Sequence, residues 1–236
     1  MLSTTREGGV SSRAFDSLNL GNHVGDEPSS VAQNREILTG ATGGQRVFWL
    51  HQVHGTNVIR VDESLGDSKV VEGDASITST PGIALAVMTA DCLPVVVWDQ
   101  KGEEIGAAHA GWRGLAEGVL ENLVQSFKAS PEELIAWLGP AIGPTAFEVG
   151  PEVRERFLAL ASQKAEVEEA FRPSEREGHY LADIYALATM RLREAGVKAV
   201  HKEEEFCTVL EEKRFFSYRR EGRTGRMATL IWKEQV

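Results

Sequence analysis

Cysteine and histidine side chains gather in two segments, and together they are suited to hold a metal ion. Cys92 and His109 lie in the stretch 89–114, TADCLPVVVWDQKGEEIGAAHAGWRG. The apolar runs on both sides of a turn at 99–102 predict a β-hairpin that places Cys92 opposite His109. The Cβ atoms of directly opposed residues lie about 4.5–5.5 Å apart, which suits a thiolate and an imidazole that share one zinc ion.

A third ligand is expected from the segment His51-Gln52-Val53-His54-Gly55, which follows a predicted strand. His54 is favoured over His51 because a residue that enters a tight turn beside a glycine can project its ring away from the sheet. His54, Cys92 and His109 then leave the fourth position of a tetrahedral zinc ion open, as in catalytic sites. Such a centre activates water or another oxygen nucleophile.

Charged side chains near these ligands have competing interpretations. Asp91, next to Cys92, either faces the pocket, where it acts as a general base or orients a ligand, or caps the turn backbone. Arg113 precedes a predicted helix, which suits an anion such as phosphate, and a structural salt bridge is the alternative. A cluster of arginines near the C-terminus either contacts phosphate or forms a solvated turn, and the residues alone favour the turn. The cluster consists of Arg219, Arg220, Arg223 and Arg226.

The elements that must position these residues are short strands interleaved with amphipathic helices. Helical periodicity predicts helices at 115–127 and 181–192, and others that begin at Pro28 and Pro151. The segment 135–138 fits a strand or a helix, because a capping sequence precedes it. The irregular interleaving predicts a mixed α/β or α+β fold. Runs rich in valine, isoleucine and aromatic residues predict strands at 46–50, 57–61, 83–88, 94–98, 105–109, 135–138, 215–218 and 228–232.

The composition is that of an ordinary folded chain. Of its 236 residues, 42% are hydrophobic and 25% are charged, so we expect one domain over residues 1–236. No apolar stretch approaches the ~20 residues of a membrane-spanning helix, and the first residues lack the apolar core of a secretory signal. The two cysteines, Cys92 and Cys207, are too few for a disulfide scaffold. We therefore expect a cytoplasmic protein.

The charge balance restricts the class of partner. The formal net charge is -10 at pH 7. Binding of nucleic acid or of anionic membranes depends on clustered lysine and arginine, so neither is expected here. Small molecules or proteins remain as partners.

Six segments in a fixed order resemble the YfiH-like family, also called the polyphenol oxidase (laccase-domain) or peptidoglycan editing factor family. They span nearly the whole chain and include rare residue types, so they are more specific than any single motif. The resemblance implies a YfiH-like fold with mixed sheets layered between helices, and zinc bound by His54, Cys92 and His109, with copper as the less favoured metal. The segments are SSRAFDSLNLGNHVGD, QVHGTNV, GDASITSTPGIALAVMTADCLPV, AAHAGWRGL, GPAIGPTAFEVG and FFSYRREGRTGRMA.

The resemblance also implies chemistry on purine nucleosides. The reactions are phosphorolysis of adenosine, inosine, guanosine and methylthioadenosine, and deamination of adenosine, so phosphate is an expected partner. The amides of Asn19 and Gln52 suit a purine edge, and a turn-closing role is the alternative for Asn19. The expected catalytic residues are Cys92, His109 and Asp91, and the expected substrate-binding residues are Asn19, Gln52 and Arg113.

Three rival functions stay open. The first is a metal-free hydrolase with Cys92 as nucleophile and His109 as base, which fits removal of a misincorporated amino acid from a peptidoglycan precursor. The second is a non-enzymatic zinc-binding protein. The third, a copper-dependent polyphenol oxidase, is disfavoured because four coppers need about ten imidazoles, whereas the chain has six histidines.

Overall fold

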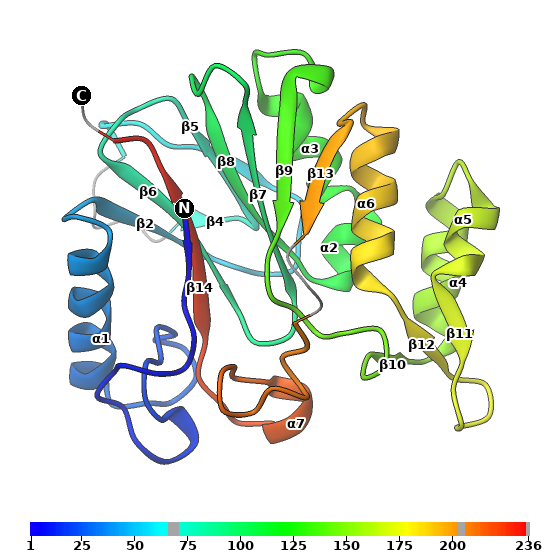
Figure 1. The fold of residues 1–236 in the computed structure, drawn as a ribbon, viewed down its shortest axis with the longest axis horizontal. Coiled ribbons are helices and arrows are strands. Elements are labelled where there is room, and N and C mark those ends of the chain that lie inside the picture. The colour runs from blue at the N-terminus through cyan, green and yellow to red at the C-terminus, as the bar shows by residue number, and fades with distance from the viewer. Residues whose placement is uncertain (66–70, 203–205, 235–236) are drawn as a thin grey trace.

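Two β-sheets face each other across an apolar layer (Figure 1). The computed structural model describes residues 1–65, 71–202 and 206–234. One sheet contains, in spatial order, β1 (Leu2–Ser3), β14 (Met227–Trp232), β6 (Ile83–Thr89), β2 (Arg46–His51) and β4 (Val71–Glu72). The other contains β13 (Ala199–Lys202), β9 (Leu134–Leu138), β7 (Leu93–Asp99), β8 (Ile105–Ala110), β5 (Ala75–Thr78) and β3 (Val58–Arg60).

Helices cover the outer faces of both sheets, so the predicted fold class, with mixed sheets layered between helices, is confirmed. On one side, Leu38 of α1 packs against small residues of β6 and β14. On the other side, α2, α3 and α6 pack on the sheet that holds β7 and β8. A small sheet of β10 (Glu148–Val149), β12 (Tyr180–Ala182) and β11 (Phe171–Pro173) lies beyond, beside α4 and α5 (Figure 1). The helices are α1 (Pro28–Ala41), α2 (Trp112–Glu117), α3 (Val119–Ser126), α4 (Pro151–Leu160), α5 (Lys164–Glu169), α6 (Ile184–Glu194) and α7 (Tyr218–Glu221).

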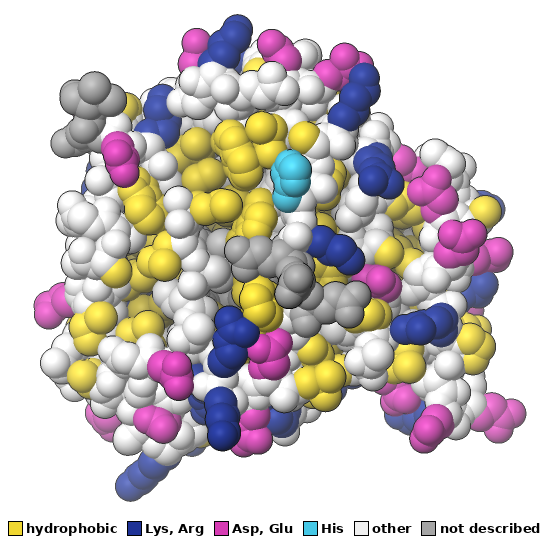
Figure 2. All heavy atoms as spheres, in the orientation of Figure 1, with side chains coloured by type: hydrophobic (Ala, Val, Ile, Leu, Met, Phe, Trp, Pro, Cys, Tyr) yellow, Lys and Arg dark blue, Asp and Glu magenta, His cyan; other side chains and the backbone are white. Residues whose placement is uncertain are grey.

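The opening between the sheets is lined by apolar side chains on one face of the molecule. Figure 2 shows these hydrophobic side chains gathered between β14 and the β7–β8 hairpin. They border a cavity of about 530 Å³ that includes Trp98, Ile231 and Trp232. None of the helices in the described residues combines the length and the apolar character that a membrane span requires.

Most predicted strands are confirmed, one segment left open between strand and helix is a strand, and one prediction needs correction. The segment 135–138 belongs to strand β9, and the capping sequence before it forms only a short 3₁₀ turn at Pro131–Glu133. The segment 215–218 is not a strand. Phe215 and Phe216 are buried in a small apolar cluster, and Ser217 caps α7 by accepting a hydrogen bond from the N–H of Arg220 at 3.2 Å.

The β7–β8 hairpin forms with a different register from the predicted one. His109 pairs with Pro94, and Val96 pairs with Ala107, so Cys92 is not directly opposite His109. The reason is a longer turn, in which the Asp99 carboxylate accepts hydrogen bonds from the backbone of Lys101, Glu103 and Glu104. Because the shift is even, every side chain keeps its predicted face of the sheet.

The predicted helix at 115–127 is divided into α2 and α3 by Gly118. This glycine has a φ angle of 102°, in the left-handed region, and it ends α2 and begins α3. A side chain in this conformation is sterically disfavoured, whereas glycine adopts it freely. The break lets α2 leave the end of β8 and α3 turn back over the sheet.

We expect Gly118→Ala to lower the free energy of unfolding by about 1–2 kcal/mol, because alanine resists the left-handed conformation. Urea denaturation measures this change. Gly40→Ala is the matched control, since Gly40 lies in α1 with no atom near an added Cβ, and there alanine should stabilise by about 0.5–1 kcal/mol. Equal effects of the two substitutions on the free energy of unfolding would contradict the conclusion that the left-handed conformation requires glycine at position 118.

Candidate metal centre

Three side chains meet at one end of the sandwich, as the sequence predicts. The ligand atoms of His54, Cys92 and His109 all lie within 4.8 Å of one another. The Cys92 Sγ atom lies 3.8 Å from His54 Nε2, and the two imidazole rings are 4.8 Å apart in an edge-to-face arrangement. Donors on a tetrahedral zinc ion are about 3.5 Å apart, as follows from Zn–S and Zn–N bonds of about 2.3 and 2.0 Å. The donor set and its spacing therefore fit one metal ion.

Two of the three candidate ligands lie in connections that cross between the two sheets, and the third lies in a strand. His54 lies between β2 and β3, and Cys92 lies between β6 and β7. His109 is the penultimate residue of strand β8, the hairpin partner of β7. The centre therefore forms only when both sheets are in place.

Asp74 holds the His54 loop in position, and the sequence analysis did not identify it. Its carboxylate is fully buried and accepts hydrogen bonds from three consecutive backbone N–H groups, those of Val53, His54 and Gly55, at 3.1, 2.9 and 2.7 Å. His54 has a φ angle of 61°. These bonds stabilise a backbone conformation that a histidine rarely adopts.

The same carboxylate orients His109. Asp74 Oδ1 lies 2.8 Å from His109 Nδ1, and the backbone N–H of His109 donates to the Asp74 carbonyl at 2.7 Å. With Nδ1 engaged, Nε2 is the ring atom that faces Cys92 and a metal ion. The signal in the sequence is a lone carboxylate directly before the buried strand β5, but β5 itself was not predicted.

Two glycines let α2 approach the centre closely. A Cβ atom on Gly111 would lie 2.7 Å from His54 Cδ2 and 3.3 Å from Cys92 Sγ. A Cβ atom on Gly114 would lie 2.6 Å from the Gly55 carbonyl oxygen. Any larger residue at either position would displace the His54 loop.

Cys92 and His109 shift each other's proton equilibria. Burial alone would raise the pKa of the Cys92 thiol, but the charge of His109 and hydrogen bonds from His109 and His54 lower it to about 6. Burial alone would lower the pKa of His109, but the Cys92 thiolate and Asp74 raise it to about 9. Without a metal ion, the pair is therefore a thiolate and an imidazolium at neutral pH.

The Asp91 carboxylate is hydrogen-bonded to a neighbouring side chain and to a backbone N–H group. Its carboxylate accepts hydrogen bonds from the Thr208 hydroxyl and from the Arg219 backbone N–H, both at 2.6 Å. Its backbone has a φ angle of 99°, which turns the chain from β6 into Cys92. The carboxylate therefore holds the start of α7, whereas the capping alternative from the sequence was a cap on the turn backbone.

A cavity of about 470 Å³ opens above the metal ligands. Its volume is in the range of sites that enclose a small organic ligand. His54, at its wall, is solvent-exposed, whereas His109 is buried. The lining residues are His23, Gln52, His54, Met88, Thr89, Ala90, Cys92, His109, Tyr218 and Arg226.

Gln52 is the one expected substrate-binding residue that lines this cavity. Its amide exchanges two hydrogen bonds with the backbone of Met88, at 2.8 and 2.7 Å. Asn19 lies outside the lining and is fully buried. The Asn19 amide bonds to Gly21 and to Asp26, which agrees with the turn-closing alternative.

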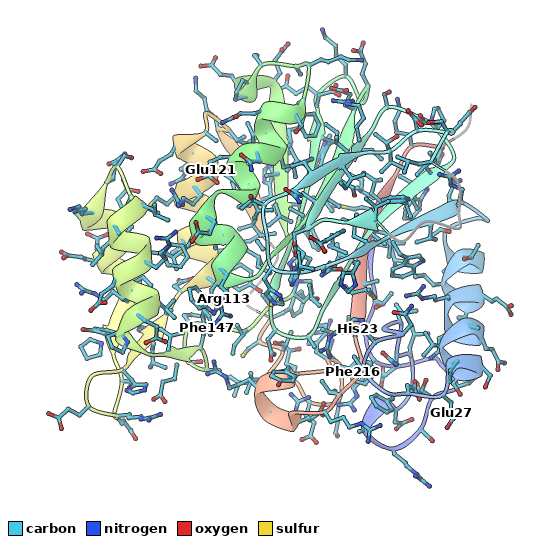
Figure 3. All side chains as sticks on the ribbon, turned by 180° about the vertical axis from the view of Figure 1, so that it is seen from behind. His23, Glu27, Arg113, Glu121, Phe147 and Phe216 are labelled. Carbon is cyan, nitrogen blue, oxygen red and sulfur yellow. The ribbon has the colours of Figure 1, made fainter. Side chains whose placement is uncertain are left out.

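The structure does not bring Arg113 into the cavity. Its side chain is exposed, and its guanidinium carbon lies 4.4 Å from the centre of the Trp112 ring. Figure 3 shows Arg113 at α2, apart from His23, which lies toward α7 and α1. The expected anion site at Arg113 is therefore separate from the lining of the metal centre.

Comparisons with known proteins agree with this architecture. A purine nucleoside phosphorylase of Pseudomonas aeruginosa is 53% identical over 97% of this chain and 91% of its own length. The purine nucleoside phosphorylase YfiH of Escherichia coli is 51% identical over 98% and 92%. A crystal structure of a Neisseria meningitidis protein matches with a TM-score of 0.92 at 49% identity, over 99% and 93%. The family described as multi-copper polyphenol oxidoreductase laccase matches residues 1–234. These matches confirm the resemblance to YfiH proteins, and the chain belongs to this laccase-domain family.

Proposed function

We propose that this protein is a zinc-dependent purine nucleoside phosphorylase. The observation that carries the proposal is an open His54–Cys92–His109 centre in a cavity large enough for a nucleoside. The names of the relatives agree with it. The substrates we propose are adenosine, inosine, guanosine and methylthioadenosine, with phosphate as the second substrate. Cytoplasmic conditions suit the reaction, because they keep a thiol such as Cys92 reduced.

The proposed reaction exchanges one bond at the sugar for another. An oxygen atom of phosphate bonds to C1′ of the ribose, the bond from C1′ to the base breaks, and the base leaves with the electron pair and takes up a proton. Bound zinc supplies a Lewis acid that polarises and orients the oxygen nucleophile. A second activity that we propose for the cavity is deamination of adenosine, in which water adds at C6 and ammonia leaves.

The protein's own residues shape the cavity for this reaction. The Gln52 amide joins the end of β2 to Met88 of β6, and so closes one wall. Asp91 fixes the start of α7 through the Arg219 N–H, which places Tyr218 at the rim. In this proposal Gln52 and Asp91 act mainly by positioning the walls around the substrate.

The copper chemistry in the family's description receives little support from this site. Among the described residues, the group that can hold a metal ion is His54, Cys92 and His109, which is one centre with two imidazoles. A multicopper oxidase needs about ten imidazoles for four coppers. Zinc, which accepts thiolate and imidazole together in an open tetrahedral site, fits better.

A metal-free Cys92–His109 hydrolase is the second candidate function. The observation that favours it is the thiolate–imidazolium pair, with a Cys92 pKa of about 6. A thiolate beside an imidazolium is the arrangement that cysteine hydrolases use for nucleophilic attack. Amide bonds of peptidoglycan precursors are the substrates we propose for this candidate.

We expect Cys92→Ala to lose bound zinc and to lower phosphate-dependent release of adenine from adenosine by more than about 100-fold. Loss of a residue that only orients a ligand already costs 10–100-fold, so loss of a ligand should cost more. Metal analysis and chromatography of the products measure both effects. Cys207→Ser is the control, because Cys207 is buried away from the metal centre. The Cys207 sulfur accepts a hydrogen bond from the Gly143 N–H, and a serine hydroxyl can accept the same bond. Full activity in Cys92→Ala would refute the mechanism.

The pKa of Cys92 can be tested in protein stripped of metal. Because the thiolate is the nucleophile, the rate of alkylation by iodoacetamide should rise with pH and reach half its maximum near pH 6. A free cysteine would reach it near about pH 8.5. Cys92→Ala should remove the part of the alkylation whose rate reaches half its maximum near pH 6. A midpoint above pH 8, or no cleavage of precursor amides in the presence of chelator, would weaken the hydrolase candidate.

Asp74→Asn should weaken zinc affinity by about 10–100-fold, because asparagine cannot accept from His109 and all three N–H groups of the His54 loop. Competition with a chromophoric chelator measures the affinity. Asp99→Asn is the matched control, since the Asp99 carboxylate also accepts from three backbone N–H groups, in the distant β7–β8 turn. Equal affinity in the two variants would show that Asp74 contributes only to folding.

A further inference from the structure

The wall of the cavity outside the metal ligands carries two basic side chains, Arg226 and His23, which the metal centre does not use. Arg226 directly precedes β14, and its backbone N–H donates to the Asn19 side chain at 2.9 Å. His23 lies in the segment before α1. Tyr218, which is 61% exposed, begins α7 beside them. Three separate segments thus converge on this wall.

The Arg226 guanidinium has unused donors. Its Nη1 atom donates to the carbonyls of Thr224 and Gly225, both at 3.0 Å. A guanidinium has five N–H groups, and in the described part of the chain Nε and Nη2 have no hydrogen-bonded acceptor. Arg226 also forms no ion pair there. The side chain is half-buried, and its guanidinium carbon lies 5.9 Å from the centre of the Tyr218 ring. Burial lowers the pKa of Arg226, and the charges of Cys92 and Asp91 act in the opposite direction. None of these described contacts occupies the Nε and Nη2 donors, which are available to an anion.

His23 lies on the same wall and offers a hydrogen-bond donor to the cavity. Its ring has no hydrogen-bond partner among the residues that the structure describes. Its pKa is lowered by burial first, and then by the positive charges of Arg226, His51 and Arg35. The lowered pKa favours the neutral imidazole at pH 7, and a neutral imidazole still donates one hydrogen bond to an anion.

The other arginines of the C-terminal cluster do not line this cavity. Arg219 donates to the carbonyls of residues 146 and 148, and Arg220 donates to those of residues 208, 209 and 215. Arg223 donates to the carbonyl of Gly25. Arg226 is the member of the cluster whose guanidinium is placed at the cavity.

We infer that Arg226, assisted by His23, binds the phosphate substrate in the part of the cavity between this wall and the metal centre. The inference rests on the proposed phosphorolysis. The planar fork of a guanidinium matches two oxygens of a phosphate group. Phosphate held here presents a further oxygen toward the centre of the cavity, where C1′ of the nucleoside must lie.

The inference separates the two proposed reactions. Phosphorolysis needs a bound phosphate, whereas deamination uses water. Loss of the Arg226 guanidinium should therefore raise the KM for phosphate, while the phosphate-independent deamination of adenosine continues. A residue with only a structural role would lower both activities together.

The test measures binding of inorganic phosphate to the zinc-loaded protein by ³¹P NMR titration. We expect Arg226→Gln to weaken binding by about tenfold or more, since charge-assisted hydrogen bonds are lost. Arg223→Gln is the matched control, because it removes the same charge from the same segment outside the cavity, and it should bind phosphate as the wild type does. Zinc content and circular dichroism report whether each variant is folded. His23→Gln, at an exposed position, should weaken binding severalfold and tests the site if Arg226→Gln does not fold.

Each outcome decides one of the two proposals. Phosphate binding that is as tight in Arg226→Gln and His23→Gln as in the wild type would overturn this inference, and so would a wild type that does not bind phosphate. Phosphate binding that depends on Arg226, in a protein that releases no base from any nucleoside, would support the subsite and overturn the phosphorylase. Phosphorolysis with an unchanged phosphate KM in Arg226→Gln would support the phosphorylase and overturn the subsite.

Discussion

The buried carboxylate of Asp74 is the constraint on which the metal centre depends. It satisfies three backbone N–H groups of the His54 loop and the Nδ1 atom of His109 at the same time. A buried carboxylate without such partners would be strongly unfavourable. Burial would raise its pKa, but the hydrogen bonds from His109 and from the loop lower it below the usual value for an aspartate. Asp74 thus stays ionised, and it keeps the His54 loop aligned with His109 of β8.

The position of Asp74 reflects how the two sheets are joined. The chain crosses from one sheet to the other between β2 and β3, between β4 and β5, and between β6 and β7. These crossings carry His54, Asp74 and Cys92, respectively. Because the crossings lie at the same end of the sandwich, residues far apart in sequence meet there. Catalytic groups on connections between rigid sheets are a common arrangement, since the sheets hold the loops still.

The grouping of His54, Cys92 and His109 could be predicted from the sequence, but the role of Asp74 in positioning these residues could not. Cys92 and His109 were expected to be directly opposed, and the true register is shifted by two residues. The ligands still meet, because an even shift preserves the face of the strand and diagonal neighbours remain within reach. Asp74 has no comparable signal, because its role depends on a loop that arrives from another part of the chain. The division of the helix at Gly118 likewise depends on a backbone angle that periodicity does not reveal.

The substrate-binding residues were harder to predict for a related reason. Arg113 has the local context of an anion site, a guanidinium at the start of a helix, yet its side chain stacks on Trp112 outside the cavity. Arg226 has no such context, and its place at the cavity follows from the pairing of β14 with β6, which also carries Met88. Local context therefore favours Arg113 as an anion-binding residue, and only the strand order shows that Arg226 is the arginine that lines the cavity of the candidate metal centre.

The two candidate functions correspond to two states of the same side chains. In the metal-free protein, the proton on His109 stabilises the Cys92 thiolate, and the thiolate in turn raises the pKa of His109 to about 9. A metal ion must displace that proton, so metal and proton compete for one position. In the proposed zinc form, the metal would supply the charge that the imidazolium supplies without it, and the thiolate would be a ligand and not a nucleophile. If both proposals hold, metal occupancy of this centre would therefore select between metal-assisted chemistry and cysteine chemistry.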